Sequence, residues 1–297
     1  MYDILSNIPE KTIKCLDHGF VTIVDVMPRI APEGQTTADH AIVQAARVSY
    51  GAGTKTVNED RGLIRYLLRH QHTTPMEMVK FKFHCKMPIF IARQWIRHRM
   101  GSFNEISGRY SVIKDEFYVP EVDSIRKQSK TNKQGGDEQI DAGFADNFIS
   151  DVGRHDIDSY DMYTQYLDLG ISREQSRMVL PLNIYTEWYW SLDLHNLLHF
   201  LALRCDSHAQ WEIQVYGNAI LDLIRPCVPF AIEAWEDYHI NRGAIKLTRL
   251  EVESLKTQIE VLKKQAHWDE SFNLALNSDN KREQEEWNNK AKKLGIL

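Results

Sequence analysis

Residues Met78–Met87 read MVKFKFHCKM and alternate between apolar and polar side chains. On an extended chain, the apolar members of this stretch all fall on one face: Val79, Phe81, Phe83 and Cys85. The lysines and His84 fall on the other face, so the pattern predicts a strand with one buried side. Residues 20–27 and 183–192 are rich in β-branched and aromatic side chains and predict two further strands.

The next segment, Pro88–Arg99, reads PIFIARQWIRHR and predicts a helix. Proline suits the first helical turn because its missing N–H would have no partner there. Arg93 and Arg97 are four residues apart, so a continuous helix would place both on one face. Residues 101–108, GSFNEISG, are rich in glycine, serine and asparagine and predict a loop that ends the helix.

The composition limits the possible class of protein. The chain has 297 residues, 43% of them hydrophobic, which is enough apolar material for a globular fold. Lysine and arginine total 36 against 41 aspartates and glutamates, and this acidic balance argues against a protein that coats polymeric nucleic acid. No apolar run approaches the roughly 20 residues that span a bilayer, and the first residues lack a leader pattern. We therefore expect a cytoplasmic protein without a membrane partner.

Two stretches differ in composition from the rest of the chain. Residues 124–150 are polar, contain a Gly-Gly pair, and predict an exposed insertion with little core of its own. We expect a main domain over residues 1–243 and a charged helical extension over residues 244–297. The extension carries side chains at alternating steps of three and four, typical of a paired helix: Ile245, Thr248, Val252, Leu255, Ile259, Leu262 and Ala266. Its partner is either its own domain or another subunit.

Four arginines surround the predicted loop: Arg93, Arg97, Arg99 and Arg109. A guanidinium offers paired, planar donors that match phosphate oxygens. Glu105 alone cannot neutralise four cations, and no other carboxylate partner is expected close by. The cluster therefore predicts a site for a phosphorylated small molecule, with backbone N–H groups of Ser107 and Gly108 as further donors. A network of structural ion pairs is the alternative.

Other candidate groups lie further along the chain. His195 and His199 are four residues apart, which is a metal-ligand spacing, although no H-E-x-x-H pattern accompanies them. Cys205 follows Arg204 and is a candidate nucleophile, but an inert thiol is the preferred interpretation. The four cysteines are far apart and predict neither a zinc ribbon nor a disulfide framework. Residues 204–212 form a dense polar group that suits a helix start or an active-site wall.

The arginine-rich stretch RQWIRHRMGSFNEISGRYS resembles the signature of flavin-dependent thymidylate synthases, in which R-H-R is followed after seven residues by serine. Arg97, His98 and Arg99 match the R-H-R element, and Ser107 matches the serine. Other blocks resemble the family in the family's order: AARVSY, HTTPMEM, FKFHCKMPIFIARQW, LPLNIYT and LRCDSHAQWEIQ. Together they cover most of residues 45–229.

The resemblance implies an enzyme that makes dTMP from dUMP. It implies FAD as cofactor, NADPH as reductant and methylenetetrahydrofolate as carbon donor, with no metal. By resemblance, the dUMP-binding residues are Gln94, Arg97, Glu105, Ile106, Ser107, Gly108, Arg109, Arg177 and Arg204. The positions that match FAD-binding residues are His72, Thr74, Glu77, Arg97, His98, Arg99, Glu105, Asp193, His195 and His199.

Arg204 matches the residue that polarises the uracil ring in this family, so the resemblance makes it the catalytic group. A fixed cation beside the imide favours its ionised form and raises electron density at the carbon to be methylated. Ser107 is interpreted as a binding hydroxyl, and Cys205 matches no catalytic position. Asp193 and His195 depart from the asparagine and arginine that relatives often carry, and an acid near a pyrophosphate is unfavourable unless it binds a hydroxyl or the adenine.

The resemblance also implies an α+β fold, with a curved mixed or antiparallel sheet flanked by helices. It further implies a homotetramer whose active sites lie between subunits. Two alternatives from other classes remain. One is a nucleotide-binding regulatory protein that has kept the fold and lost turnover. The other is a zinc hydrolase that uses His195 and His199.

Overall fold

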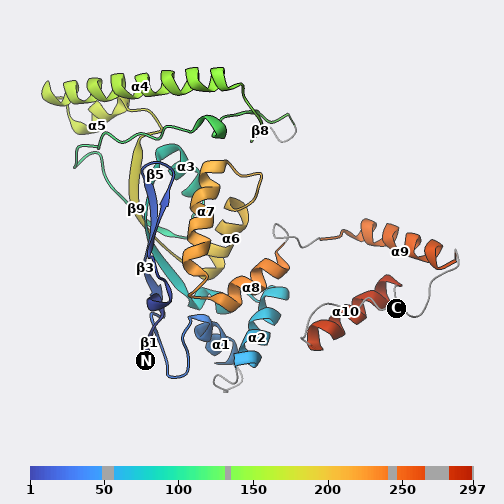
Figure 1. Cartoon of the computed structure of the whole chain (residues 1–297). Coiled ribbons are helices and arrows are strands. Elements are labelled where there is room, and N and C mark those ends of the chain that lie inside the picture. The colour runs from blue at the N-terminus through green and yellow to red at the C-terminus, as the bar shows by residue number, and fades with distance from the viewer. Residues whose placement is uncertain (49–56, 131–134, 240–245, 265–280, 296–297) are drawn as a thin grey trace. The chain divides into compact units, whose positions relative to one another are not determined.

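The computed structural model forms two compact units, Met1–Glu236 and Asp237–Leu297. The residues that it describes are 1–48, 57–130, 135–239, 246–264 and 281–295. The first unit combines strands and helices, and the described part of the second is helical (Figure 1). The sequence-based division after residue 243 stays a prediction of where the main domain ends. Every helix in the described part of the chain is too short or too polar to cross a lipid bilayer.

The strands and helices alternate irregularly along the chain. The strands are β1 Tyr2–Asp3, β2 Thr12–Cys15, β3 Gly19–Met27, β4 Ile30–Ala31, β5 Lys80–Pro88, β6 Ser102–Glu105, β7 Arg126–Gln128, β8 Gly136–Gln139 and β9 Tyr185–Asp193. The α-helices are α1 Asp39–Arg47, α2 Val57–Arg69, α3 Ile89–Trp95, α4 Ala142–Asp168, α5 Arg173–Ser176, α6 Leu194–Arg204, α7 Trp211–Ile224, α8 Pro229–Tyr238, α9 Arg249–Lys264 and α10 Lys281–Leu294. Three short 3-10 helices used below are η3 Thr74–Met78, η4 Val122–Ser124 and η5 Arg177–Val179.

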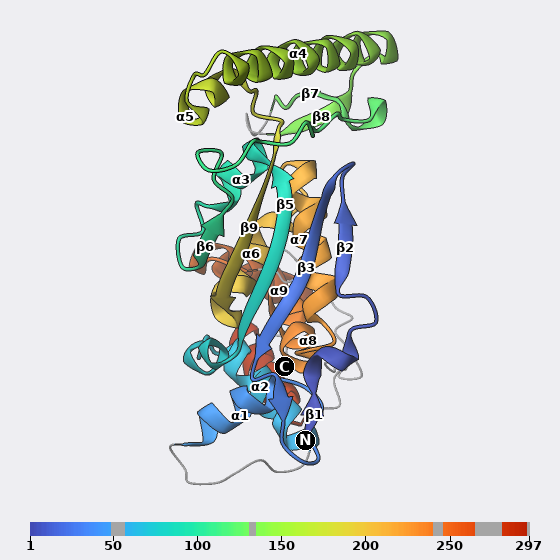
Figure 2. The same cartoon turned by 90° about the vertical axis from the view of Figure 1, so that its left-hand side faces the viewer.

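One five-stranded sheet organises the first unit, in the order β2-β3-β5-β9-β6. All of its neighbouring strands are antiparallel. The predicted α+β class is confirmed, and of the two sheet types expected the antiparallel one is found. Figure 2 looks onto one face of this sheet, and α6 and α7 lie behind it.

The alternation in β5 produces the expected buried face. The four apolar side chains of residues 79–85 are at most 1% exposed. They contribute to an aromatic core with Trp188 and Trp190 of β9, where the ring of Trp95 lies 5.1 Å from that of Trp190. Lys86 lies on the polar face but is buried there, where it forms a 2.7 Å ion pair with Glu116.

Two local predictions around the arginine-rich loop are wrong. Helix α3 ends at Trp95, so Arg97 lies in the following turn and shares no helical face with Arg93. Part of the expected loop is strand β6, which pairs with β9 at the sheet edge. The ring of Phe103 stacks within 5.9 Å of Trp190, and this burial stabilises a strand that is otherwise polar. A side chain at Gly101 would collide with Trp190, so the chain needs glycine there.

The polar stretch 124–150 has regular structure in its described part. It contains the β7–β8 hairpin and the first turns of α4, whose N-terminus is capped by Asp141. Ala145 of α4 is fully buried, so this segment contributes to the packing of the first unit. In Figure 1, α4 lies across one end of the sheet.

The second unit contains α9 and α10, which contact each other. Ile259 of the predicted seam is buried, and so is Ala291 of α10. Ile245 and Ala266, the two ends of the seam, lie outside the described residues. Helix pairing within this unit therefore accounts for the buried part of the seam, and a subunit contact through it stays a prediction.

Candidate functional site

The expected nucleotide and flavin residues gather into two groups in this chain. We call the first the α3–α6 cluster, because its members come from the ends of α3 and α6 and from the start of α7. It comprises Gln94, His98, His199, Arg204 and Gln210. We call the second the β6-end cluster, and it comprises Glu105, Ile106, Ser107, Gly108 and Arg177.

Arg204 is the centre of the α3–α6 cluster. It is the last residue of α6 and is half-buried. Its Nε donates to Nε2 of His98 at 3.1 Å, and its Nη2 donates to the carbonyl oxygen of Gln94 at 3.4 Å. The Nε2 of Gln94 in turn donates to Oε1 of Gln210. The guanidinium is thus held by two groups that carry no negative charge, and part of its donor capacity stays available for a ligand.

His98 is neutral in this arrangement. Burial and the neighbouring Arg204 cation lower the pKa of His98 to about 4. Because Nε2 accepts a hydrogen bond, the neutral ring carries its proton on Nδ1. Burial also lowers the pKa of Arg204, which nevertheless stays cationic. The neutral His98 ring orients the Arg204 guanidinium and leaves its positive charge in place. An aspartate at position 98 would neutralise that charge.

The β6-end cluster lines a small cavity of about 100 Å³. Lys86 and Glu187 of the polar sheet face also line it, and so does Thr186, which alternates with them on β9, so the cavity lies at the end of the sheet where β6 ends. Oγ1 of Thr186 donates to Oε1 of Glu105 at 2.6 Å and fixes that carboxylate. Gly108 is buried, and a Cβ there would lie 2.7 Å from Cδ1 of Ile113, so the cavity wall depends on glycine.

The prediction that Arg109 has no carboxylate partner is wrong. Its Nε lies 3.3 Å from Oε2 of Glu174 in α5, and both side chains are 56% exposed. No local pattern predicts this pair, because the two residues are 65 positions apart, on separate elements. An exposed pair of this kind contributes little stability, so a phosphate could replace Glu174 at little cost.

Arg97 and Arg99 agree with the prediction that the arginines of this loop have no carboxylate partner close by. Both side chains are exposed, and neither forms an ion pair with another described residue. Arg93, on α3, is also exposed and has no ion pair among the described residues. Their guanidinium groups are the kind of donor that suits a phosphate or pyrophosphate.

The remaining flavin candidates lie near the start of α6. Thr74 and Glu77 belong to η3, which contacts α6. Asp193 caps α6, since its Oδ1 accepts from the backbone N–H of Asn196 at 2.9 Å. The Asp193 side chain therefore has a structural role at the start of α6. His195 lies in the first turn of α6, and His72 contacts the ring of Tyr66.

The two clusters are separate within one chain. Residue 98 precedes β6 and residue 105 ends it, so the strand itself separates them. None of the hydrogen bonds or ion pairs found among the described residues joins a member of one cluster to a member of the other. No member of the α3–α6 cluster lines the cavity of the β6-end cluster.

Sequence reasoning left the role of Gln210 open and missed its contact. The residue belongs to the polar group before α7, and it stands at the N-cap position of that helix. Asp206 and Ser207, two natural capping residues, do not occupy this position. The contact with Gln94 depends on packing of α3 against α7, which no local pattern reveals.

The described residues give no support to a metal site. No group of three or more His, Cys, Asp or Glu side chains among them could hold a metal ion. The ring of His199 lies 5.9 Å from that of His98, so His199 belongs to the α3–α6 cluster.

Comparisons with known proteins assign the chain to a family. Residues 33–230 match the model named thymidylate synthase complementing protein. A flavin-dependent thymidylate synthase from Dictyostelium discoideum is 53% identical over 293 residues, 99% of this chain and 90% of that protein. One from Thermus thermophilus is 51% identical over 245 residues, 82% of this chain and 85% of that protein. The chain therefore belongs to the thymidylate synthase complementing protein family.

A solved structure agrees with this assignment. The UMP/dUMP methylase PolB from Streptomyces cacaoi, crystallised with 5-Br dUMP, matches with a TM-score of 0.67 and 30% identity. The match covers 76% of this chain and 98% of that chain. The expected resemblance is thus confirmed in both sequence and fold.

The neutral state of His98 can be measured directly. In NMR titrations of the histidine ring carbons, we expect the midpoint of the His98 titration at about pH 4, so that the ring is neutral at pH 7. Because an unfolded chain would protonate this ring near its ordinary pKa of 6.5, the free energy of unfolding should fall as the pH drops from 6.5 to about 4.

The control variant is Arg204→Gln, which removes the neighbouring cation. The pKa of His98 should rise in this variant, because one of its two main causes is lost. An unchanged His98 titration in Arg204→Gln would contradict the contact between the two side chains.

Proposed function

We propose that this protein is a flavin-dependent thymidylate synthase, which methylates dUMP to dTMP. Methylenetetrahydrofolate donates the carbon, and FAD reduced by NADPH supplies the hydride. The relatives named above and the fold shared with a UMP/dUMP methylase support this proposal. The observation that carries it is the α3–α6 cluster, in which a catalytic cation is oriented without being neutralised.

Arg204 acts on the uracil ring. Its guanidinium stabilises negative charge that develops on the imide, and this increases electron density at the carbon that accepts the methyl group. Orientation by His98 and by the Gln94 carbonyl limits the rotamers of Arg204, so little reorganisation is needed when dUMP binds.

The chain offers suitable groups for FAD. Arg97 and Arg99 present guanidinium groups that form no ion pair with a described residue and suit the pyrophosphate, and Thr74 and Glu77 belong to η3, which contacts α6. His72, His98, Glu105, Asp193, His195 and His199 complete the proposed flavin set. When bound, the flavin supplies the hydride and the one-carbon chemistry, so the protein needs no nucleophile of its own.

The nucleotide site is shared between subunits. The β6-end cluster supplies Glu105, Ile106, Ser107, Gly108 and Arg177, with Arg109 beside them. Gln94, Arg97 and Arg204 come from another chain of a homotetramer. The separation of the two clusters within one chain supports this arrangement, because no member of the α3–α6 cluster lines the cavity of the β6-end cluster. We place the enzyme in the cytoplasm, with small molecules and its own copies as partners.

The reaction itself gives a decisive test. Purified protein should form dTMP only when dUMP, methylenetetrahydrofolate, NADPH and FAD are all present. A protein that binds dUMP but does not oxidise NADPH and forms no dTMP would instead be the regulatory alternative.

The cysteines should be dispensable for turnover. Burial raises the pKa of Cys15 and of Cys227 to about 12, so neither thiol is ionised at neutral pH. Burial also raises the pKa of Cys85. Cys205 is partly exposed, whereas the other three cysteines are buried. We expect Cys205→Ala to keep kcat within about threefold of the wild-type value, because substitutions at partly exposed sites change the packing little. A loss of about 100-fold or more would indicate nucleophilic catalysis by the thiol.

A further inference from the structure

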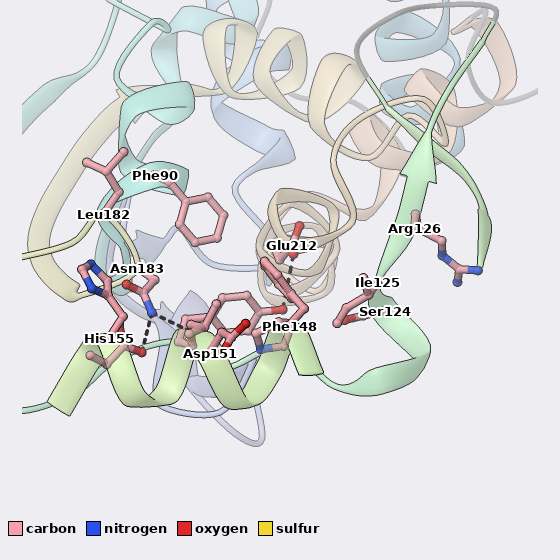
Figure 3. Close-up of a pocket in the computed structure, with 14 residues that line it drawn as sticks. Phe90, Ser124, Ile125, Arg126, Phe148, Asp151, His155, Leu182, Asn183 and Glu212 are labelled. Atoms are coloured by element: carbon pink, nitrogen blue, oxygen red, sulfur yellow. Dashed lines mark hydrogen bonds between the residues drawn. The ribbon is translucent and has the colours of Figure 1, made fainter. Parts of the chain in front are cut away.

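A cavity of about 630 Å³ lies under α4, outside both clusters. Phe148 and Val152 of α4 line it together with Phe90 and Tyr118, and Figure 3 shows Phe90 across the cavity from α4. The volume lies within the range of small-molecule sites, and most of the lining is apolar. No residue of the proposed nucleotide or flavin sets lines this cavity.

Asp156 of α4 is the unusual member of the lining. Asp156 is only 4% exposed, and its Oδ2 accepts a hydrogen bond from Nδ2 of Asn183 at 2.8 Å. Its Oδ1 is buried and has no hydrogen-bond partner among the described residues. An unsatisfied buried carboxylate oxygen is costly, and a ligand that donates to it would remove that cost.

The charges around the cavity favour a cation. Glu212 is half-buried, accepts only from the hydroxyl of Tyr118 at 3.3 Å, and has no ion pair with a described residue. Asp151 is already paired with Arg154. Arg126 is the single lysine or arginine in the lining, it is exposed, and Figure 3 places it on the side away from Asn183.

We propose that this cavity is a second ligand site, which takes an aromatic molecule carrying an amidine-like group with paired N–H donors. One N–H of this group binds the unpartnered Oδ1 of Asp156, and the rings contact Phe90, Tyr118 and Phe148. The cationic group also lies in the field of Glu212, which no described cation neutralises. An aromatic anion of the same shape is excluded by the two carboxylates.

A matched pair of probes tests this site. Biphenyl-4-carboxamidine and biphenyl-4-carboxylate have the same shape and opposite charge, and their binding to the full-length protein is measured by isothermal titration calorimetry. We expect saturable binding of the amidine and none of the carboxylate. Asp156→Asn should weaken amidine binding at least about tenfold, because a hydrogen bond to a charged group is lost.

A second pair of variants separates loss of the site from loss of folding. Val152→Phe fills the cavity from α4 and should abolish amidine binding, whereas Ile157→Phe, at a residue of α4 that is 64% exposed and does not line the cavity, should leave it unchanged. Thermal unfolding of each variant shows whether it folds.

Four results would overturn the proposal. They are absence of amidine binding to the folded wild-type protein, equal binding of the carboxylate, unchanged binding in Val152→Phe, and displacement of the amidine by dUMP or methylenetetrahydrofolate. Displacement of the amidine by dUMP or methylenetetrahydrofolate would assign the amidine to the reaction site. The assay for dTMP formation tests the proposed function separately, and its outcome does not depend on this result.

Discussion

Replacing Arg204 with alanine should lower kcat by about 100- to 1,000-fold, the usual effect of removing one preorganised donor from a site where charge develops. The nucleotide should still bind, because the donors of the β6-end cluster remain. We therefore expect the Kd of dUMP to change much less than kcat, and equilibrium binding together with initial rates measures both.

Two control variants define this result. Arg249→Ala removes an exposed arginine of α9 that pairs with Glu253, and it should leave kcat unchanged. His98→Asn keeps a neutral acceptor but changes its position, so it should lower kcat less than Arg204→Ala does. Equal kcat values for Arg204→Ala and wild type would show that another group polarises the ring.

Two inactive variants should restore activity when their subunits are mixed. Arg204→Ala damages the α3–α6 cluster, and Arg177→Ala damages the β6-end cluster. If each site takes one cluster from each of two chains, random reassembly of equal amounts leaves about one quarter of the sites intact. The two proteins are mixed, partly unfolded, reassembled, and assayed for dTMP formation.

The matched control uses two variants of the same cluster. A mixture of Arg204→Ala and Gln94→Ala should recover no activity, because no site in it receives an undamaged α3–α6 cluster. If the Arg204→Ala and Arg177→Ala mixture also stays inactive although mixed tetramers form, the site lies within one chain and the shared arrangement is wrong.

The sequence predicted the elements with strong local signals. The alternation in residues 79–85 gave the central strand, and the β-branched and aromatic stretches gave β3 and β9. It did not predict the end of α3 or strand β6. Strand β6 depends on the packing of Phe103 and Gly101 against Trp190, which is 87 positions beyond Phe103 in the chain.

The sequence can propose the residues of the candidate site, but it cannot predict how they are arranged. Motif resemblance named Arg204, Gln94 and Ser107, but spacing along the chain does not tell which residues share a cavity. The neutral His98 acceptor, the Gln94–Gln210 contact and the Arg109–Glu174 pair arise from tertiary packing. The cavity under α4 has no motif, because its lining comes from short stretches scattered between residues 90 and 212.

A crystal structure of the protein with dUMP and FAD tests the central claim most directly. The claim is that the exposed cations of Arg97 and Arg99 serve anionic ligands. We expect their guanidinium groups within hydrogen-bond distance of phosphate oxygens, with the β6-end cluster of another subunit completing the nucleotide site. A structure in which protein carboxylates pair with both arginines, while the ligands bind elsewhere, would contradict the account.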